Sequence, residues 1–146
     1  MALAVGKEGD MNAMTISWGT LGELWGHPVV TVYVSSSRYT HSFMERNEYF
    51  TVTGFPEEKC SALQYIGSHS GRDDKDKISK AGLTPSFTEL GNPIFEEANL
   101  SPSNVASSIN RRSTLPSSHR RSSRYTRRGL GIHTMYIGEI VNTWIK

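Results

Sequence analysis

Short apolar runs, separated by glycine, proline and polar residues, recur along the chain. Residues 11–18 alternate between two sets of side chains, one of them mainly apolar, as is typical of a strand with one buried face. Residues 29–34 are rich in valine, which predicts a buried strand. Residues 49–55 form a third such run, ended by Gly54 and Pro56. The pattern therefore predicts a mainly β protein.

The predicted helices are short and lie between or after these strands. Residues 40–47 begin with Thr40, a residue type that caps helix N-termini. Residues 57–66 carry apolar side chains at helical spacing, and residues 75–81 end before Gly82. These helices are too short and too few to change the fold class.

The remaining patterned segments complete the expected architecture. Residues 19–28 form a turn-rich link, and residues 94–100 and 131–145 are predicted strands. Short strands separated by small helices predict an antiparallel β-barrel with helical decorations. At 146 residues, the chain fits a single domain over residues 1–146.

Residues 101–132 interrupt this pattern. They contain nine serines and seven arginines, with neither an acidic residue nor a lysine. The other 114 residues then carry nine basic against fourteen acidic side chains, so the basic balance of the chain belongs to this segment. We expect an aberrant segment that is disordered or a solvent-exposed loop, because it has few apolar residues to bury.

Composition disfavours several classes of protein. Cys60 is the single cysteine, which excludes an internal disulfide, and we expect it buried on a helix face. No apolar run approaches the roughly 20 residues of a membrane span, so a cytoplasmic protein is expected. The histidines show no metal-ligand spacing, and no metal site is expected. Trp18, Trp25 and Trp144 are expected in the core or at a dimer interface.

Three polar stretches have the residue types of a binding site. Residues 12–19 alternate small hydroxyl side chains along a strand, which suits a flat ligand with polar edges but equally a strand half in solvent. Residues 35–40 place serines and an arginine before a helix, as phosphate sites and ordinary loops both do. Residues 67–73 could wrap a second phosphate or the ribityl chain of a flavin, or form a solvated loop. The Asp/Lys run at 74–77 is interpreted as solvated surface.

In this order and spacing, the stretches resemble the flavin reductase-like, FMN-binding split-barrel family, in particular its short flavoredoxin-like members. The resemblance covers about residues 7–100 and 133–146. It rests on the segments 12–19, 24–25, 38–40, 67–73, 76–78, 81–85 and 135–140, together with Pro28.

The resemblance implies an FMN-binding split β-barrel. It implies that the strand over residues 12–17 lies along the isoalloxazine ring, that Arg38 and Thr40 hold the phosphate, and that residues 70–72 close over the flavin. The implied cofactor-binding residues are Asn12, Ala13, Met14, Thr15, Ser17, Arg38, Thr40, Ser70, Gly71 and Arg72. It also implies NAD(P)H as the electron donor and a homodimer with FMN near the subunit interface. No catalytic acid or base is expected, because the chemistry belongs to the cofactor.

Two features depart from the family pattern. Ser35 and Ser36 stand where relatives often have Arg-Pro, which removes one charge from the expected phosphate site. Relatives also carry a further segment, with a first barrel strand, before the counterpart of Asn12. We therefore expect a shortened N-terminus and an incomplete barrel.

A frameshift explains the anomalous segment. Relatives continue after the counterpart of Leu100 with a strand similar to Val-Leu-Glu-Cys-Arg-Lys-Leu-Tyr. The codons of residues 103–109, read one base earlier, can spell Leu-Glu-Cys-Arg-Lys-Leu-Tyr, and those of residues 113–118 can spell Phe-Asp-Pro-Ala-Phe-Leu. Our hypothesis is that residues from about 101 to about 130 are frameshifted. Gene sequencing tests the hypothesis. If the neighbouring reading frame does not encode these two peptide sequences, the hypothesis is wrong.

The resemblance favours NAD(P)H-linked flavin reduction, or electron transfer through bound FMN. A non-catalytic FMN-binding module and an inactive, damaged copy of the family are the nearest alternatives. A different alternative is that the arginines of residues 101–132 bind RNA or another polyanion. No RNA-binding fold signature accompanies them, so nucleic acid is not the expected partner.

Overall fold

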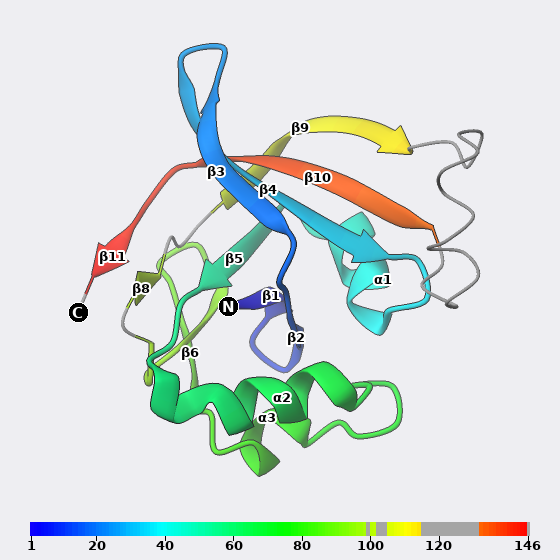
Figure 1. Cartoon of the computed structure of the whole chain (residues 1–146), viewed down its shortest axis with the longest axis vertical. Helices are drawn as coiled ribbons and strands as arrows, with labels where there is room; N and C mark the ends of the chain where they lie inside the picture. Colours follow the sequence, from blue (N-terminus) through cyan, green and yellow to red (C-terminus); the bar gives the residue numbers. More distant parts are fainter. Residues whose placement is uncertain (99, 102–104, 115–131, 146) are drawn as a thin grey trace.

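A computed structural model describes residues 1–98, 100–101, 105–114 and 132–145. Strands dominate these residues, and the helices are short (Figure 1). In chain order the elements are β1 (Ala2–Lys7), β2 (Asp10–Thr15), β3 (Gly19–Leu24), β4 (His27–Ser35), α1 (Tyr39–Arg46), β5 (Tyr49–Thr53), the 3-10 helix η1 (Glu57–Lys59), α2 (Cys60–Ser68), α3 (Lys77–Lys80), β6 (Pro85–Phe87), β7 (Pro93–Phe95), β8 (Leu100–Ser101), β9 (Val105–Thr114), β10 (His133–Ile140) and β11 (Trp144–Ile145). The predicted mainly β fold with short helices is confirmed.

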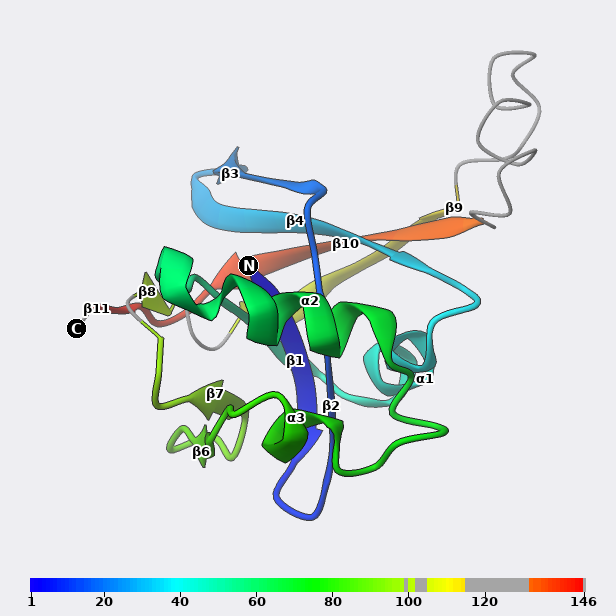
Figure 2. The same ribbon diagram turned by 60° about the horizontal axis from the view of Figure 1, so that its bottom comes forward.

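One antiparallel sheet organises the molecule. Its seven strands follow the order β2-β1-β5-β9-β10-β4-β3, while β6 pairs with β7 and β8 pairs with β11 in two small sheets. The sheet does not close on itself, because β2 and β3 remain its edge strands among the described residues. Figures 1 and 2 show α2 and α3 together on the side of β1 and β2, where they flank that end of the sheet.

Residues 2–7 form an interior strand that the sequence pattern does not predict. β1 pairs with β2 on one side and β5 on the other. Its residues Ala2–Val5 are all fully buried, because Leu3 and Val5 face one core and Ala2 and Ala4 face another. A strand buried on both faces shows no alternation of apolar and polar residues, so the usual strand signal is absent.

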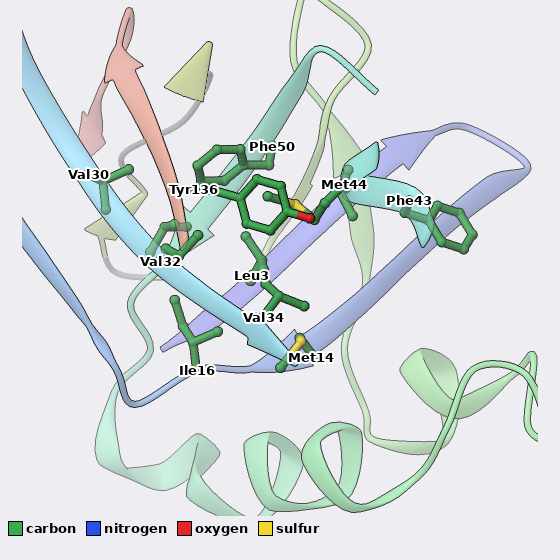
Figure 3. Packing of buried hydrophobic residues seen from close by; sticks show 12 residues of the cluster. Leu3, Met14, Ile16, Val30, Val32, Val34, Phe43, Met44, Phe50 and Tyr136 are labelled. Carbon is green, nitrogen blue, oxygen red and sulfur yellow. The ribbon is translucent and has the colours of Figure 1, made fainter. Parts of the chain in front are cut away.

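The larger core lies between the sheet and α1. Aliphatic side chains from β1, β2, β4 and β5 meet Phe43 and Met44 of α1 and the ring of Tyr136 from β10 (Figure 3). Its buried members are Leu3, Val5, Met14, Ile16, Val30, Val32, Val34, Phe43, Met44, Phe50, Val52 and Tyr136. The inward face of α1 therefore fixes this helix, and with it the residues that precede it, against β2 and β4.

A smaller core lies beneath α2. Ala62 and Ile66 of α2 pack on the short side chains of Ala2, Ala4 and Ala13, which let the helix approach the sheet closely. Cys60 opens α2 but is exposed, so the expectation of a buried cysteine is wrong. The cause is its place at the first turn of α2, on the side away from the sheet-facing residues.

A β-hairpin replaces the turn-rich link expected over residues 19–28. β3 and β4 pair antiparallel up to Leu24 and His27, and Trp25 and Gly26 form the turn. Both turn residues have positive φ, 56° and 77°, as a hairpin turn that follows the strand twist requires. Trp25 is 64% exposed and Trp18 is 47% exposed, so neither lies in the core of this chain.

Residues 101 and 105–114 of the segment 101–132 lie in strands. β9 lies in the middle of the main sheet, between β5 and β10. This places a strand at residues 105–114 where we expected a loop or disorder; residues 102–104 and 115–131 lie outside the described residues. β9 pairs with β10 through two register shifts, whereas β4 pairs with β10 without any. The frameshift hypothesis remains a prediction.

Two features are absent from the described residues. No helix among them is long and apolar enough to cross a membrane. Within the same residues, no group of three or more His, Cys, Asp or Glu side chains could hold a metal ion.

Candidate functional site

Strand β2 runs between α1 and α2 and carries the polar residues singled out in the sequence (Figures 1 and 2). Its alternation separates two faces. Asn12 and Met14 face the start of α1, and the buried Asn12 side chain donates from Nδ2 to Thr40 Oγ1 at 2.8 Å. Ala13 points the other way, into the small core beneath α2.

A cavity of about 230 Å³, here the α1–α2 cavity, opens where β2, the start of α1 and the end of α2 meet. Hydroxyl, amide and basic side chains dominate its lining, and no carboxylate belongs to it among the described residues. The lining residues are Asn12, Met14, Ser37, Arg38, Tyr39, Thr40, Ile66, Ser68, His69, Ser70, Gly71 and Lys77. Such a lining favours an anion.

A second cavity of about 200 Å³, here the β2–β4 cavity, continues from the first. The two cavities share Met14 and Arg38. The second follows the chain as it leaves β2, and its lining residues are Met14, Thr15, Ile16, Ser17, Trp18, Tyr33, Ser35, Arg38 and His133. Together the cavities form a path from a cationic end to an end with aromatic and hydroxyl side chains.

A third cavity of about 480 Å³ adjoins the β2–β4 cavity at Ile16, Ser17 and Trp18. It lies against β3 and β4 and is lined mainly by apolar side chains, including Leu21 and Val30. No charged side chain belongs to its lining among the described residues, so it does not extend the anion site.

Arg38 is placed by the segment that follows β4. It precedes α1, and its Nη1 donates to the carbonyl oxygen of Gly67, near the end of α2, at 2.9 Å. This bond ties the start of α1 to the end of α2. On the opposite side of β2, the Thr15 hydroxyl donates to the carbonyl oxygen of Leu63, which fixes α2 to the strand.

A second cation, Lys77, lies at the base of the α1–α2 cavity and is only 3% exposed. Its amine donates to the carbonyl oxygens of Ile66 at 3.2 Å and His69 at 3.0 Å. Burial and, to a lesser degree, the charge of Arg38 lower the pKa of Lys77 to about 8, while Asp74 acts in the opposite direction. Two cations near one another, in a cavity whose lining holds no carboxylate among the described residues, favour an anionic ligand.

The loop after α2 depends on the absence of a side chain at Gly71. A Cβ there would lie 2.3 Å from Asn12 Oδ1 and 3.1 Å from Asn12 Cγ. We expect Gly71→Ala to lower the free energy of unfolding by about 1–3 kcal/mol, because the loop or the Asn12–Thr40 pair must move. Urea denaturation measures the change. Gly22→Ala, where nothing lies within 4 Å of the added Cβ, is the matched control; equal losses in both variants contradict the expectation.

The sequence profile of the flavin reductase like domain matches residues 2–146. The chain belongs to this family. No curated protein matches the sequence.

Solved structures place this flavin reductase-like chain among split-barrel proteins. It is similar to a flavoredoxin from Methanosarcina acetivorans, with a TM-score of 0.77 and 18% identity over 99% of this chain and 67% of that chain. It is similar to an FMN-binding protein from Thermus thermophilus, with a TM-score of 0.76 and 22% identity over 99% and 70%. An NADH:FAD oxidoreductase from Streptomyces globisporus gives a TM-score of 0.74 and 18% identity over 99% and 74%. At these identities the likeness establishes the fold, and the split-barrel expectation is confirmed.

Most of the site residues predicted from the sequence of this flavin reductase-like chain lie on the two joined cavities. The α1–α2 cavity brings together Asn12, Met14, Arg38, Thr40, Ser70 and Gly71. The β2–β4 cavity adds Thr15 and Ser17. Two predicted residues stay outside both linings: Ala13 packs beneath α2, and Arg72 lies over the Tyr39 ring at 5.4 Å from its centroid. Whether the predicted residues contact a flavin stays a prediction.

Sequence reasoning missed several lining residues. Lys77 is the most consequential, because the Asp/Lys run that contains it was interpreted as solvated surface, and its burial makes that interpretation wrong for this residue. The signal was its membership of the family-like segment 76–78. The lining residues Ile66, Tyr33 and His133 lie outside the three polar stretches and were also missed. Other lining residues belong to those stretches but not to the residues predicted to bind the cofactor: Ser37, Tyr39, Ser68 and His69 in the α1–α2 cavity, and Ile16, Trp18 and Ser35 in the β2–β4 cavity.

Proposed function

We propose that this protein binds FMN and takes part in NAD(P)H-linked flavin reduction. One observation carries the proposal: a cationic cavity, with no carboxylate among the described residues of its lining, adjoins a second cavity along the end of β2, and the two share Met14 and Arg38. FMN has the matching form, with a phosphate at one end and a flat ring system at the other. The name of the similar FMN-binding protein from Thermus thermophilus supports the same ligand, and those of the flavoredoxin and the NADH:FAD oxidoreductase support a flavin.

The residues present fit FMN in chemical type. At the phosphate end, the guanidinium of Arg38 and the hydroxyls of Thr40 and Ser70 would bind the anion. Gly71 lets the loop after α2 come close to β2. Along the ring, the backbone and side chains of residues 12–17 would supply hydrogen bonds to the polar edge. Ala13 would contribute through its backbone, since its side chain faces the core beneath α2.

When bound, FMN supplies the capacity to accept reducing equivalents from a nicotinamide. The chain's own residues would bind and orient the ligand, and the charges of Arg38 and Lys77 would favour negative charge on it. No side chain is assigned a proton transfer. The ligand specificity of the protein would therefore depend on the residues that line the cavities.

The reaction is tested by anaerobic assay of the purified full-length chain with FMN and either NADH or NADPH. Loss of nicotinamide absorbance at 340 nm above the protein-free rate is the expected result. FMN binding without oxidation of either nicotinamide contradicts the reductase and favours an electron-transfer or FMN-binding module.

We also propose that the protein acts as a homodimer. Strand β3 lies at the sheet edge, and its region exposes Trp18, Leu21 and Trp25 beside the third cavity. Covering these side chains would remove apolar surface from water. Light scattering of the purified protein should give a mass of about twice 16.3 kDa, and a monomeric mass contradicts this part of the proposal.

A further inference from the structure

The ring of His69 is an exposed aromatic surface beside the α1–α2 cavity. Among the described residues, the aromatic side chains in the lining of that cavity are Tyr39 and His69. The ring of Tyr39 is half-buried, with the guanidinium of Arg72 over it at 5.4 Å and the Phe43 ring edge-on at 5.2 Å between centroids. His69 is exposed. It therefore offers a ligand in the cavity a flat surface that Tyr39 does not.

Contacts at the end of α2 hold the His69 ring in place. The ring stacks on that of Tyr65, with 3.9 Å between the centroids and 14° between the planes. Its Nδ1 lies 3.1 Å from the Ser68 hydroxyl and 3.0 Å from the Tyr65 carbonyl oxygen. The Tyr65 hydroxyl in turn donates to Asp74 at 3.3 Å. Because Tyr65 covers one face of the ring, the opposite face is the open one, and a ring held in this way loses little freedom when a ligand stacks on it.

The backbone of His69 places this ring at the cationic end of the cavity. The amine of Lys77 donates to the His69 carbonyl oxygen at 3.0 Å, and Arg38 lines the same cavity. The proposed function puts the phosphate of FMN at this end. A second group joined to that phosphate could therefore reach the open face of His69.

We propose that His69 is an adenine-stacking residue and that this protein binds FAD in preference to FMN. The inference rests on the proposed function and names the flavin nucleotide that the site prefers. FAD carries adenosine monophosphate joined to the phosphate of its FMN half. The flavin half can therefore keep the two joined cavities while the adenine stacks on His69, as bases stack on aromatic side chains in other nucleotide sites.

A nicotinamide dinucleotide also carries an adenine. That adenine could stack on His69 only with its own diphosphate near Arg38 and Lys77, the two cations that the proposed function assigns to the flavin phosphate. Phosphates of two separate ligands would repel one another there. FAD brings its adenine through the phosphate that the site would already hold, so we assign the adenine to FAD.

A purely structural role for His69 is the competing interpretation. His69 is the C-cap residue of α2, and its ring bonds to the Tyr65 carbonyl oxygen in the last turn of that helix. In that case replacing His69 would change the stability of the helix end but not the ratio of the FAD and FMN affinities. This ratio therefore separates the two roles.

Equilibrium dialysis of the purified full-length protein against FMN and against FAD measures the ratio. The wild-type chain is expected to bind FAD about tenfold more tightly than FMN, and His69→Ala to lower the FAD affinity about 5- to 20-fold while changing the FMN affinity less than about twofold. FAD binding no tighter than FMN in the wild type overturns the inference and leaves the proposed function standing, as does a change in His69→Ala that is absent or equal for the two flavins. Failure of both flavins to bind overturns both.

Two further variants make the result specific to the ring. His69→Phe keeps a flat ring and should keep the preference for FAD, and its loss in this variant would contradict stacking. Gln64→Ala removes an exposed side chain of α2 that lies outside the lining of the cavity, and should change neither affinity. A loss of FAD affinity in Gln64→Ala as large as that in His69→Ala would contradict the assignment to His69.

One further ligand distinguishes the two sources of adenine. The binding of NAD⁺ to protein saturated with FMN should be the same in the wild type and in His69→Ala. Weaker NAD⁺ binding in the variant would assign the adenine on His69 to the nicotinamide dinucleotide and overturn its assignment to FAD.

Discussion

Replacing Arg38 with glutamine is expected to weaken FMN binding by about 10- to 100-fold, because a hydrogen bond to a charged group contributes about 1.5–3 kcal/mol. Arg38 is the one basic residue that lines both cavities among the described residues. Its guanidinium is already held in place by a hydrogen bond to the carbonyl oxygen of Gly67. The loss of affinity caused by this substitution should be smaller for riboflavin, because riboflavin has no phosphate. Flavin fluorescence titration at moderate ionic strength measures both affinities.

Two further arginine variants make the test specific. Arg46→Gln removes a positive charge from α1, where Arg46 pairs with Asp10 at 2.8 Å, and should leave FMN affinity within about threefold. Arg72→Gln tests the position of Arg72 over Tyr39, outside both cavities, and should also have a small effect. Equal losses in all three variants would mean that general charge attraction, and not a site at Arg38, binds the phosphate.

Leu3→Ala is expected to lower the free energy of unfolding by about 3–5 kcal/mol. Leu3 is fully buried in β1, where it packs in the larger core between the sheet and α1 (Figure 3). A loss of this size is a large part of the roughly 5–15 kcal/mol that stabilises a typical domain. Urea denaturation followed by tryptophan fluorescence measures it.

Leu90→Ala is the matched control, because the same atoms are removed from a side chain that is 51% exposed. Its expected change is below about 0.5 kcal/mol. If Leu3→Ala lowered the free energy of unfolding as little as this control does, residues 2–7 would not form an interior strand of the sheet. The pair therefore tests the element that the sequence pattern fails to predict.

The sequence predicts strands that show alternating side chains or a run of β-branched residues, and misses strands that show neither pattern. β2 alternates because α1 and the core lie on one side and α2 on the other, and β4 is rich in valine, so both are recognisable. β1 has apolar side chains on both faces and resembles an unpatterned terminus. β3 is exposed along nearly its whole length, and its glycines are typical of a link. Neither strand could be placed without its neighbours in the sheet.

The candidate site shows the same limit. Local motifs identify residues near the start of α1 and along β2, because the residues that line the cavities there follow one another in the sequence. The position of Lys77 depends on packing, since α3 folds back beneath the end of α2 and buries a side chain that stands among charged residues in the sequence. Arg72 lies over the Tyr39 ring and outside both linings, and its role toward a flavin stays a prediction.

We propose that this chain binds FMN at the joined cavities. Equilibrium dialysis of the purified full-length protein against FMN, followed by the visible absorption spectrum of the retained fraction, tests it most directly. We predict a saturable flavin band near one FMN per chain that Arg38→Gln reduces and Arg46→Gln does not. A folded protein that retains no flavin at saturating FMN would contradict the claim.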